Sequence, residues 1–265
     1  MLKTWLEHPL TRGANLDDPS TTWLRRDIME QKRFLRRIYE EWYTMLAAAV
    51  PPVSAGPGQP PAPAVELGAG AGFLREYIDR LIATEIFRCP DITMVLDACA
   101  LPFEDRSLRA VVMTDVLHHI PRVRDFFVEA GRCVQPGGVI AMIEPWVTPW
   151  SRLIYTKLHH EPFRPDTDAW EFPASGPLSG ANGALPWVLF ERDRARFEAE
   201  FPMWRIETIR PLMPFRYLVS GGVSLRGLVP AWSFGAWTAL ERAMTPWHHR
   251  WAMFAFVVLR RGDNV

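Results

Sequence analysis

The sequence has little cysteine, no excess of charge of either sign and no long apolar run. Its three cysteines, Cys89, Cys99 and Cys133, are scattered and odd in number, which argues against a disulfide framework and shows no metal-ligand spacing. Thirty basic residues balance thirty acidic ones. This balance argues against a general polyanion binder, so we expect no nucleic-acid partner.

No apolar run approaches the length of a membrane span, and the first residues lack a basic-then-apolar signal segment. We therefore expect a soluble, cytoplasmic protein, for which peripheral membrane contact stays open. The 265 residues can bury a sizeable core, and no internal repeat is visible. Nothing in the sequence indicates an oligomeric state.

The most informative segment present is Val65 to Phe73, an apolar strand that breaks into a glycine-rich turn. Glycine tolerates positive φ and has no Cβ, so such a turn lets the backbone approach a ligand closely. The spacing is G-x-G-x-G, which differs from the dinucleotide pattern G-x-G-x-x-G. Glu66, just before the first glycine, favours a cationic ligand over a phosphate. We expect a helix from Phe73 to about Leu81 behind this turn.

Four more apolar segments end in an acid or a turn, and each is predicted to be a strand. In open α/β sheets, ligands bind outside the carboxyl ends of the strands. A helix over Val123 to Cys133 separates the last two. The predicted strands are Leu81–Glu85, Ile92–Ala98, Arg109–Asp115 and Val139–Pro145.

Three further motifs sharpen this pattern: Asp97-Ala98 followed by Leu101-Pro102-Phe103, then Leu117-His118-His119-Ile120, then Pro136-Gly137-Gly138. In this order they resemble the class I S-adenosylmethionine-dependent methyltransferases of the small-molecule type, over about residues 64–144. The resemblance implies an α/β, Rossmann-like sheet of seven strands in the order 3-2-1-4-5-7-6, with strand 7 antiparallel and helices on both faces. It also implies an N-terminal helical cap and S-adenosyl-L-methionine as cofactor, and the course of the chain after the fifth strand adds two insertions.

The resemblance also assigns roles at the cofactor. Glu66 would hold the amino group, Glu85 the ribose hydroxyls and Asp97 the adenine amine. One departure concerns Glu85, because only Ile86 to Asp91 separates it from the next strand, so the usual helix is trimmed to a loop or the second strand is displaced. The cofactor-binding residues implied are Glu66, Gly68, Ala69, Gly70, Gly72, Glu85, Asp97, Ala98, Asp115 and Val116.

We expect residues 1–265 to form a single methyltransferase domain. Residues 1–50 form an arm and a helix, which runs from Thr22 to Ala49 behind a cap at Ser20 or Thr21. Residues 51–63 are a proline-rich linker, 64–146 the cofactor-binding core, and 147–265 the substrate-side insertions and C-terminal strands. In this last part we predict a helix within Ser151–Pro162, an irregular segment over Phe172–Gly183, a helix over Phe190–Phe201, a strand over Trp204–Arg210, a helix over Ser233–Met244 and a strand over Trp251–Arg260.

Methyl transfer from a sulfonium needs alignment of nucleophile and methyl carbon more than a fixed catalytic dyad. His118 and His119 follow the fourth strand, where methyl and acceptor should meet, and His160 lies in the first insertion. We take these three as candidate catalytic residues, with structural packing as the alternative. We expect no metal site, since the adjacent residues His159, His160 and Glu161 project in different directions.

The leading hypothesis is therefore a methyltransferase for an unidentified small molecule, with a lipid, isoprenoid or glycan intermediate as possible acceptors. The alternative is a non-catalytic cofactor-binding or scaffold protein with the same fold. The glycine spacing and Asp97-Ala98 disfavour a nicotinamide-dependent oxidoreductase. The neutral charge and the absence of an N/D-P-P-[YF] signature disfavour RNA methylation.

Overall fold

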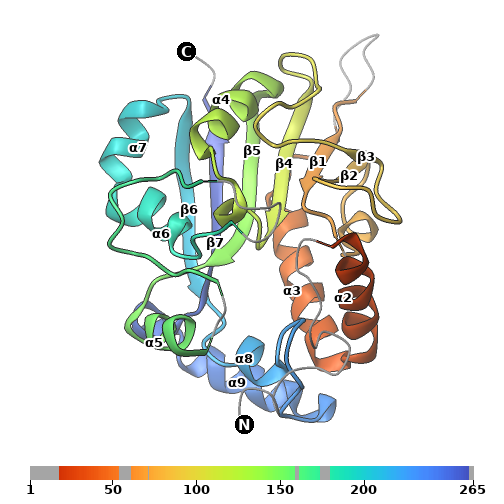
Figure 1. The fold of residues 1–265 in the computed structure, drawn as a ribbon, viewed down its shortest axis with the longest axis vertical. Coiled ribbons are helices and arrows are strands. Elements are labelled where there is room, and N and C mark those ends of the chain that lie inside the picture. The colour runs from red at the N-terminus through yellow and green to blue at the C-terminus, as the bar shows by residue number, and fades with distance from the viewer. Residues whose placement is uncertain (1–17, 54–60, 71, 159–160, 174–179, 263–265) are drawn as a thin grey trace.

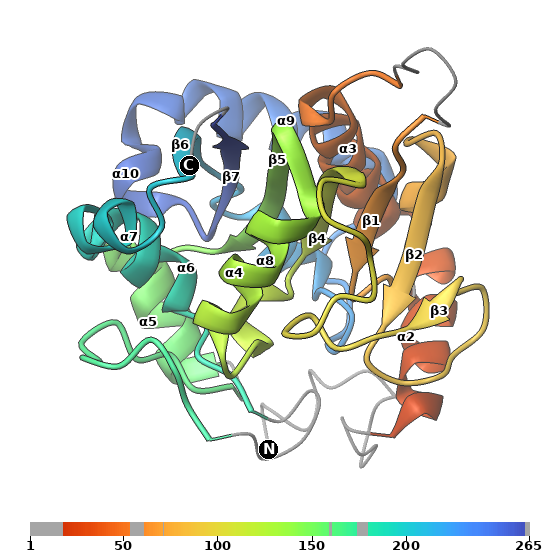
Figure 2. The ribbon, with the colours of Figure 1, turned by 90° about the horizontal axis from the view of Figure 1, so that it is seen from above.

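The computed structural model describes residues 18–53, 61–70, 72–158, 161–173 and 180–262. Its centre is a seven-stranded sheet in the order β3-β2-β1-β4-β5-β7-β6 (Figures 1 and 2). Strands β1 to β5 pair in parallel, and β7 runs antiparallel to both β5 and β6. The predicted strand order and the antiparallel seventh strand are confirmed. The strands are β1 (Ala64–Leu67), β2 (Leu81–Glu85), β3 (Met94–Val95), β4 (Leu108–Thr114), β5 (Val134–Pro145), β6 (Trp204–Leu212) and β7 (Phe254–Arg261).

Successive side chains of the central strands bury on opposite faces of the sheet. Val111 and Ile140 pack on the face covered by α4 (Val123–Cys133) and α7 (Arg194–Glu200). Val112 and Ala141 pack on the other face, against α3 (Arg33–Ala49). Both faces are covered by helices, as Figure 2 shows, which explains why the strands read as nearly continuous apolar runs.

The N-terminal helix is broken in two, so the prediction of one helix from Thr22 to Ala49 is wrong. Helix α2 covers Pro19–Gln31, which places Ser20 and Thr21 inside it, and α3 follows after Lys32. Lys32 has non-helical dihedrals, and its ammonium donates to the backbone carbonyls of Ser220, Gly222 and Leu225. This tertiary attachment accompanies the break, and it lets α2 turn toward the carboxyl ends of the strands (Figure 1).

The predicted helix from Phe73 to Leu81 is also wrong. Only one 3-10 turn, Leu74–Glu76, follows the glycines before β2 begins at Leu81. Arg80 adopts a φ of 53°, and its carbonyl accepts a hydrogen bond from the Ala64 amide, which aligns β2 beside β1. Among residues 72–80, which the structure describes, this single 3-10 turn stands where the helix was predicted.

The remaining strands differ from expectation mainly at their ends. Strand β3 is only two residues long, and no helix separates it from β2, which matches the trimmed-loop alternative. Strand β5 begins at Val134, five residues before the predicted start. The final strand begins at Phe254, because Trp251 ends a short helix, α10 (His248–Trp251).

Two helical insertions complete the fold. The first, after β5, contains α5 (Pro149–Leu158) and α6 (Leu185–Trp187), then a π turn over Val188–Arg192 and α7 in place of the single helix predicted over Phe190–Phe201. The second, after β6, contains α8 (Arg216–Ser220) and α9 (Phe234–Ala243), which lie beside α3 (Figure 1). Short 3-10 helices cover Leu117–His119, Ala231–Ser233 and Thr245–Trp247. Within the described ranges, none of the helices has the length and apolar character that crossing a bilayer requires.

Candidate functional site

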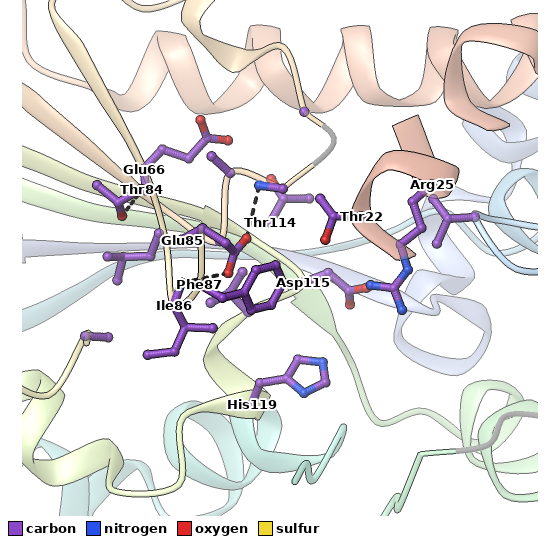
Figure 3. Close-up of a pocket in the computed structure, with 18 of the residues that line it drawn as sticks. Thr22, Arg25, Glu66, Thr84, Glu85, Ile86, Phe87, Thr114, Asp115 and His119 are labelled. Carbon is purple, nitrogen blue, oxygen red and sulfur yellow. Dashed lines mark hydrogen bonds between the residues drawn. The ribbon is translucent and has the colours of Figure 1, made fainter. Parts of the chain in front are cut away.

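A pocket of about 390 Å³ lies where β1, β2 and β4 end, at the carboxyl edge of the sheet (Figure 3). This is the edge at which open α/β sheets bind ligands, and the volume is in the range of small-molecule sites. The sheet side is lined by the glycine turn and the residues that follow each strand. The opposite side is lined by α2, α3 and residues of the second insertion.

The glycine turn is tightly enclosed by its neighbours. Gly68 has a φ of 66°, and a Cβ added there would lie 2.4 Å from Val116 Cγ2. A Cβ on Gly72 would lie 2.5 Å from the Tyr43 hydroxyl. Gly70, with a φ of 44°, donates its amide to Glu85. The turn therefore requires glycine at its first and third glycine positions for lack of space.

Two buried carboxylates lie beneath this turn, Glu66 on β1 and Glu85 at the end of β2. Glu85 accepts hydrogen bonds from the Gly70 amide at 3.1 Å and the Ile86 amide at 2.9 Å, one on each oxygen. Each carboxylate oxygen has a second lone pair, so Glu85 can still accept from a ligand hydroxyl. Burial raises the pKa of Glu85 above its usual range.

Among the residues that the structure describes, no backbone amide donates to Glu66 as Gly70 and Ile86 do to Glu85. Burial raises the pKa of Glu66 to about 8; the charge of Arg75 opposes the rise and that of Glu85 adds to it. A carboxyl group that burial makes costly to ionise gains most from a cationic partner, because an opposite charge favours its ionised form. Glu66 is thus suited to an amine.

Asp97 and Ala98 follow β3 and line the far end of the pocket. The Asp97 carboxylate accepts the Cys99 amide at 2.8 Å, and it lies 3.7 Å from Arg122. Its side chain is half exposed, so it can reach a ligand at the pocket rim.

Asp115 and Val116 follow β4. Asp115 has a φ of 63°, an uncommon conformation for a residue other than glycine, and its amide donates to the Ile143 carbonyl. Burial raises the pKa of its carboxyl to about 7; Glu161 and Glu144 add to the rise, while His118 and Arg25 oppose it. The turn at Asp115 directs a carboxyl into the pocket at the point where β4 gives way to the histidine pair.

His118 is fully buried behind the pocket wall and does not line the pocket. Its Nδ1 lies 2.7 Å from Glu144 Oε2, while Glu144 Oε1 accepts the amides of Val116 and Leu117. Burial lowers the pKa of His118, but its contacts with Glu144 and Glu161 outweigh this effect and raise the pKa well above the usual value.

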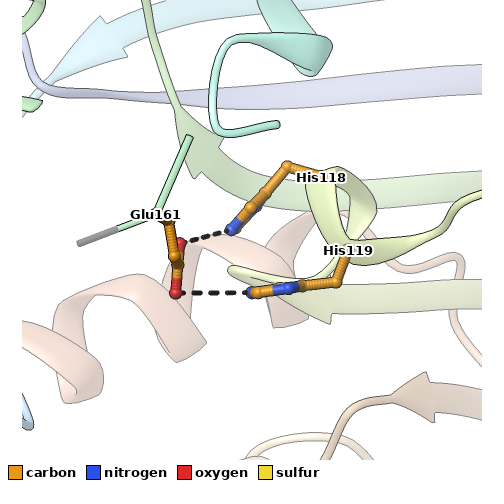
Figure 4. A group of neighbouring side chains, drawn as sticks. All are labelled: His118, His119 and Glu161. Carbon is orange, nitrogen blue, oxygen red and sulfur yellow. Dashed lines mark ion pairs between the residues drawn. The ribbon is translucent and has the colours of Figure 1, made fainter. Parts of the chain in front are cut away.

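His119 and Glu161 line the pocket itself (Figure 3 for His119). His119 Nε2 lies 3.8 Å from Glu161 Oε1, and His118 Nε2 lies 3.5 Å from Glu161 Oε2 (Figure 4). Burial, together with the charge of His118, lowers the pKa of His119 to about 3. Residues 42 positions apart in the sequence thus meet in one cluster.

Several pocket residues lie outside the sequence-based site. Tyr39 and Tyr43 come from α3, Tyr217 from α8, and Arg25 from α2. Tyr39 and Tyr43 could be suspected from the sequence, because aromatic residues crowd the predicted N-terminal helix. Nothing local distinguishes Tyr217 or Arg25, because their approach depends on how α2 and α8 dock.

The structure brings the ten predicted cofactor residues together in this pocket. Of the three histidines predicted for catalysis, His119 lines it, His118 lies behind its wall, and His160, with its neighbour His159, falls outside the described residues. Among the described residues, the first insertion supplies Glu161 to the pocket.

One family model matches part of this chain. Residues 65–142 match the family model described as a methyltransferase domain. A search of curated proteins by sequence finds no significant match.

Solved structures share the fold at low sequence identity. A chain from the complex of the Haloferax volcanii Trm112 methyltransferase activator with a proposed methyltransferase is 14% identical, with a TM-score of 0.51 over 95% of this chain and 99% of that chain. Geranyl diphosphate C-methyltransferase from Streptomyces coelicolor A3(2) is also 14% identical, with a TM-score of 0.48 over 86% and 80%. A proposed sarcosine dimethylglycine methyltransferase from Galdieria sulphuraria is 15% identical, with a TM-score of 0.46 over 87% and 88%.

Proposed function

We propose that this protein transfers a methyl group from S-adenosylmethionine to a small molecule, because residues 65–142 match the family model of a methyltransferase domain and the sheet has the strand order expected of the class I fold. The observation that carries the proposal is the gathering of the ten cofactor residues in one pocket. These residues come from four separate strand ends, so their meeting depends on the whole sheet.

On the cofactor side, three acidic side chains each bind a different group of S-adenosylmethionine. Glu66 pairs with the amino group, since a buried carboxyl with a raised pKa gains most from a cation. Glu85 accepts the ribose hydroxyls with the lone pairs that the Gly70 and Ile86 amides leave. Asp97 accepts the adenine amine at the rim.

On the acceptor side, aromatic side chains support a ligand with an apolar body. Tyr39 and Tyr217 line the pocket, and burial raises the pKa of each, so their rings present neutral hydroxyls. A lipid or isoprenoid intermediate suits such a lining better than a glycan, whose many hydroxyls need more polar partners.

The chemistry needs the acceptor atom in line with the sulfonium methyl, in a site from which water is excluded. His119 and Glu161 orient the acceptor in this proposal, because both line the pocket near Asp115. His118, which is fully buried, is a positioning residue behind them. A non-catalytic scaffold would not need both a complete set of cofactor contacts and an acceptor wall.

Calorimetry with S-adenosylmethionine and S-adenosylhomocysteine tests the cofactor. We expect a Kd between about 1 μM and 1 mM for both, with NADH giving no heat. Incubation with methyl-labelled S-adenosylmethionine and a cell extract, followed by partition between organic solvent and water, tests the acceptor. Label in the organic phase supports an apolar acceptor, whereas cofactor binding without any labelled product, once the unreacted cofactor has been removed from the aqueous phase, would favour the scaffold alternative.

A further inference from the structure

The side chains of His118, His119 and Glu161 converge on one point beside the pocket (Figure 4). The two histidines lie on the 3-10 helix Leu117–His119, and Glu161 follows α5 in the first insertion. Their ligand atoms, the two imidazole nitrogens and a carboxylate oxygen, all lie within 4.8 Å of one another. Two imidazoles and a carboxylate are a common ligand set for transition metals.

The Nδ1 atom of each histidine ring has its own hydrogen-bond acceptor. His118 Nδ1 donates to Glu144 Oε2 at 2.7 Å, and His119 Nδ1 donates to the Gly180 carbonyl at 3.3 Å. Such bonds set the tautomer and orientation of metal-binding histidines, because they leave the Nε2 lone pair for the cation. Both Nε2 atoms face Glu161.

His118 Nε2 is buried and has no hydrogen-bond partner among the described residues. Its distance of 3.5 Å from Glu161 Oε2 is too long for a strong hydrogen bond. An unsatisfied buried nitrogen is destabilising, so a ligand that satisfies it is favoured. A cation between the three side chains would satisfy it.

The spacing of the three side chains is close to that of metal ligands. Metal–nitrogen and metal–oxygen bonds of about 2.1 Å at a tetrahedral angle place ligand atoms about 3.4 Å apart. Each Nε2 atom lies near a different Glu161 oxygen, at 3.5 Å for His118 and 3.8 Å for His119, and one ligand atom from each residue falls within 4.8 Å of the others. A bound cation would draw the three side chains closer together.

A second grouping, Asp115, His118 and Glu144, does not fit a cation. Its His118 Nδ1–Glu144 distance of 2.7 Å is that of a hydrogen bond and leaves no space for an ion between the two atoms. Glu144 instead supports the first grouping from behind, since it also accepts two backbone amides.

We propose that His118, His119 and Glu161 bind one divalent transition-metal cation, with a free coordination position open to the pocket. Two imidazole nitrogens favour zinc or a similar ion over magnesium or calcium, which prefer oxygen ligands. The cation also offsets the carboxylates of Asp115, Glu144 and Glu161, which gather here.

The open position gives the metal a role at the acceptor. His119 and Glu161 line the pocket, so an oxygen of the acceptor can complete the coordination shell. A bound cation lowers the pKa of a coordinated hydroxyl and holds it in place, which favours its action as a nucleophile. This role rests on the proposed methyl transfer, whereas metal binding itself does not.

Metal binding is tested on the full chain after treatment with a chelator, by titration with Zn²⁺, Co²⁺ and Mg²⁺. We expect one Zn²⁺ per chain from this site, visible d–d bands with Co²⁺, and no saturable binding of Mg²⁺. Each of His119→Ala and Glu161→Gln should weaken Zn²⁺ binding at least tenfold and change the Co²⁺ spectrum. His249→Ala, which removes an exposed imidazole on α10, is the matched control and should bind like the parent chain.

The melting temperature without metal shows whether each variant folds. Zn²⁺ affinity and Co²⁺ spectra that stay unchanged in His119→Ala and Glu161→Gln would overturn the site and indicate binding elsewhere on the chain. So would the absence of saturable Zn²⁺ binding by the parent. Calorimetry with S-adenosylhomocysteine on the metal-free parent separates the two proposals, since its failure would sink the methyltransferase function and leave the metal site standing.

Discussion

At the residue scale, Asp97 and Asp125 offer a matched pair for testing the adenine contact. Both carboxylates lie near Arg122, at 3.7 and 3.3 Å, and their side chains are equally exposed, at 50% and 49%. Only Asp97 lines the pocket. We expect Asp97→Ala to weaken binding of S-adenosylhomocysteine by about 1–3 kcal/mol, because a hydrogen bond to the ligand is lost. Asp125→Ala should leave the Kd unchanged, and equal losses in the two variants would point to Arg122 instead of adenine recognition.

Glu66 predicts a pH-dependent affinity. Its pKa is raised to about 8, so it is mostly neutral at pH 6 and increasingly ionised toward pH 7.5. Only the carboxylate form attracts the ammonium group of the ligand. We expect the affinity for S-adenosylhomocysteine to rise about tenfold from pH 6.0 to 7.5, measured by calorimetry. Glu66→Gln should bind weakly and with a flat profile over this range.

The raised pKa of Glu66 also predicts that the stability of the ligand-free protein falls as the pH rises, whereas the affinity for the ligand increases. A glutamate whose folded-state pKa exceeds its unfolded value favours the neutral form in the native state. Its stabilising contribution is therefore fully present below the unfolded pKa of 4.5 and is lost as the pH rises from there to about 8. Between about pH 5 and 8, the melting temperature of the ligand-free parent should fall relative to that of Glu66→Gln. A parent that remains as stable as Glu66→Gln at pH 9 would show that burial of Glu66 costs little.

At the scale of single elements, a comparison of Gly68 in the glycine turn with Gly137 in β5 separates the effect of backbone strain from the effect of lack of space. Gly68 and Gly137 have φ values of 66° and 76°, but a Cβ meets Val116 at 2.4 Å in the first and nothing within 4 Å in the second. We expect Gly137→Ala to lose about 1–2 kcal/mol of stability from strain alone and to keep its cofactor affinity. Gly68→Ala should lose more stability and at least tenfold in affinity. Denaturant unfolding and calorimetry measure the two effects, and similar affinities in both variants would contradict a role for this turn in binding.

At the scale of the whole molecule, a buried ion pair joins the second insertion to the N-terminal helices. Arg216 on α8 contacts Glu241 on α9 at 2.6 Å and Glu41 on α3 at 2.8 Å, and both Arg216 and Glu241 are buried. This attachment holds Tyr217 beside Trp42 and Tyr39 in the aromatic cluster above the pocket.

Removing only the guanidinium group of Arg216 should therefore lower the stability of the protein. We expect Arg216→Met to lose about 3–5 kcal/mol of unfolding free energy, because Glu241 stays buried without its partner charge. Arg216→Met combined with Glu241→Gln should recover much of this loss, since the amide is neutral and its oxygen can still accept the Phe215 and Arg216 backbone amides. Arg242→Met, an exposed change on α9, should stay within about 0.5 kcal/mol in urea unfolding. A double variant as unstable as Arg216→Met would contradict this account.

The sequence by itself determined the strand segments of the parallel sheet, its resemblance to a known family gave their order, and both together indicated which residues line the pocket. Apolar segments that end in Glu85, Asp97 and Asp115 were readable as parallel strands, and the rule that ligands bind at their carboxyl ends placed these acids together. Helix α4 was predicted at its observed bounds, because its apolar periodicity and flanking strands are local signals.

Tertiary structure decided the rest. The break at Lys32 depends on carbonyls of the second insertion, and the missing helix after the glycine turn depends on how closely β2 must follow β1. The meeting of His118 and His119 with Glu161 likewise depends on where the first insertion crosses the sheet edge. Periodicity and spacing describe neighbours along the chain, whereas these contacts join residues that only the packed fold brings together.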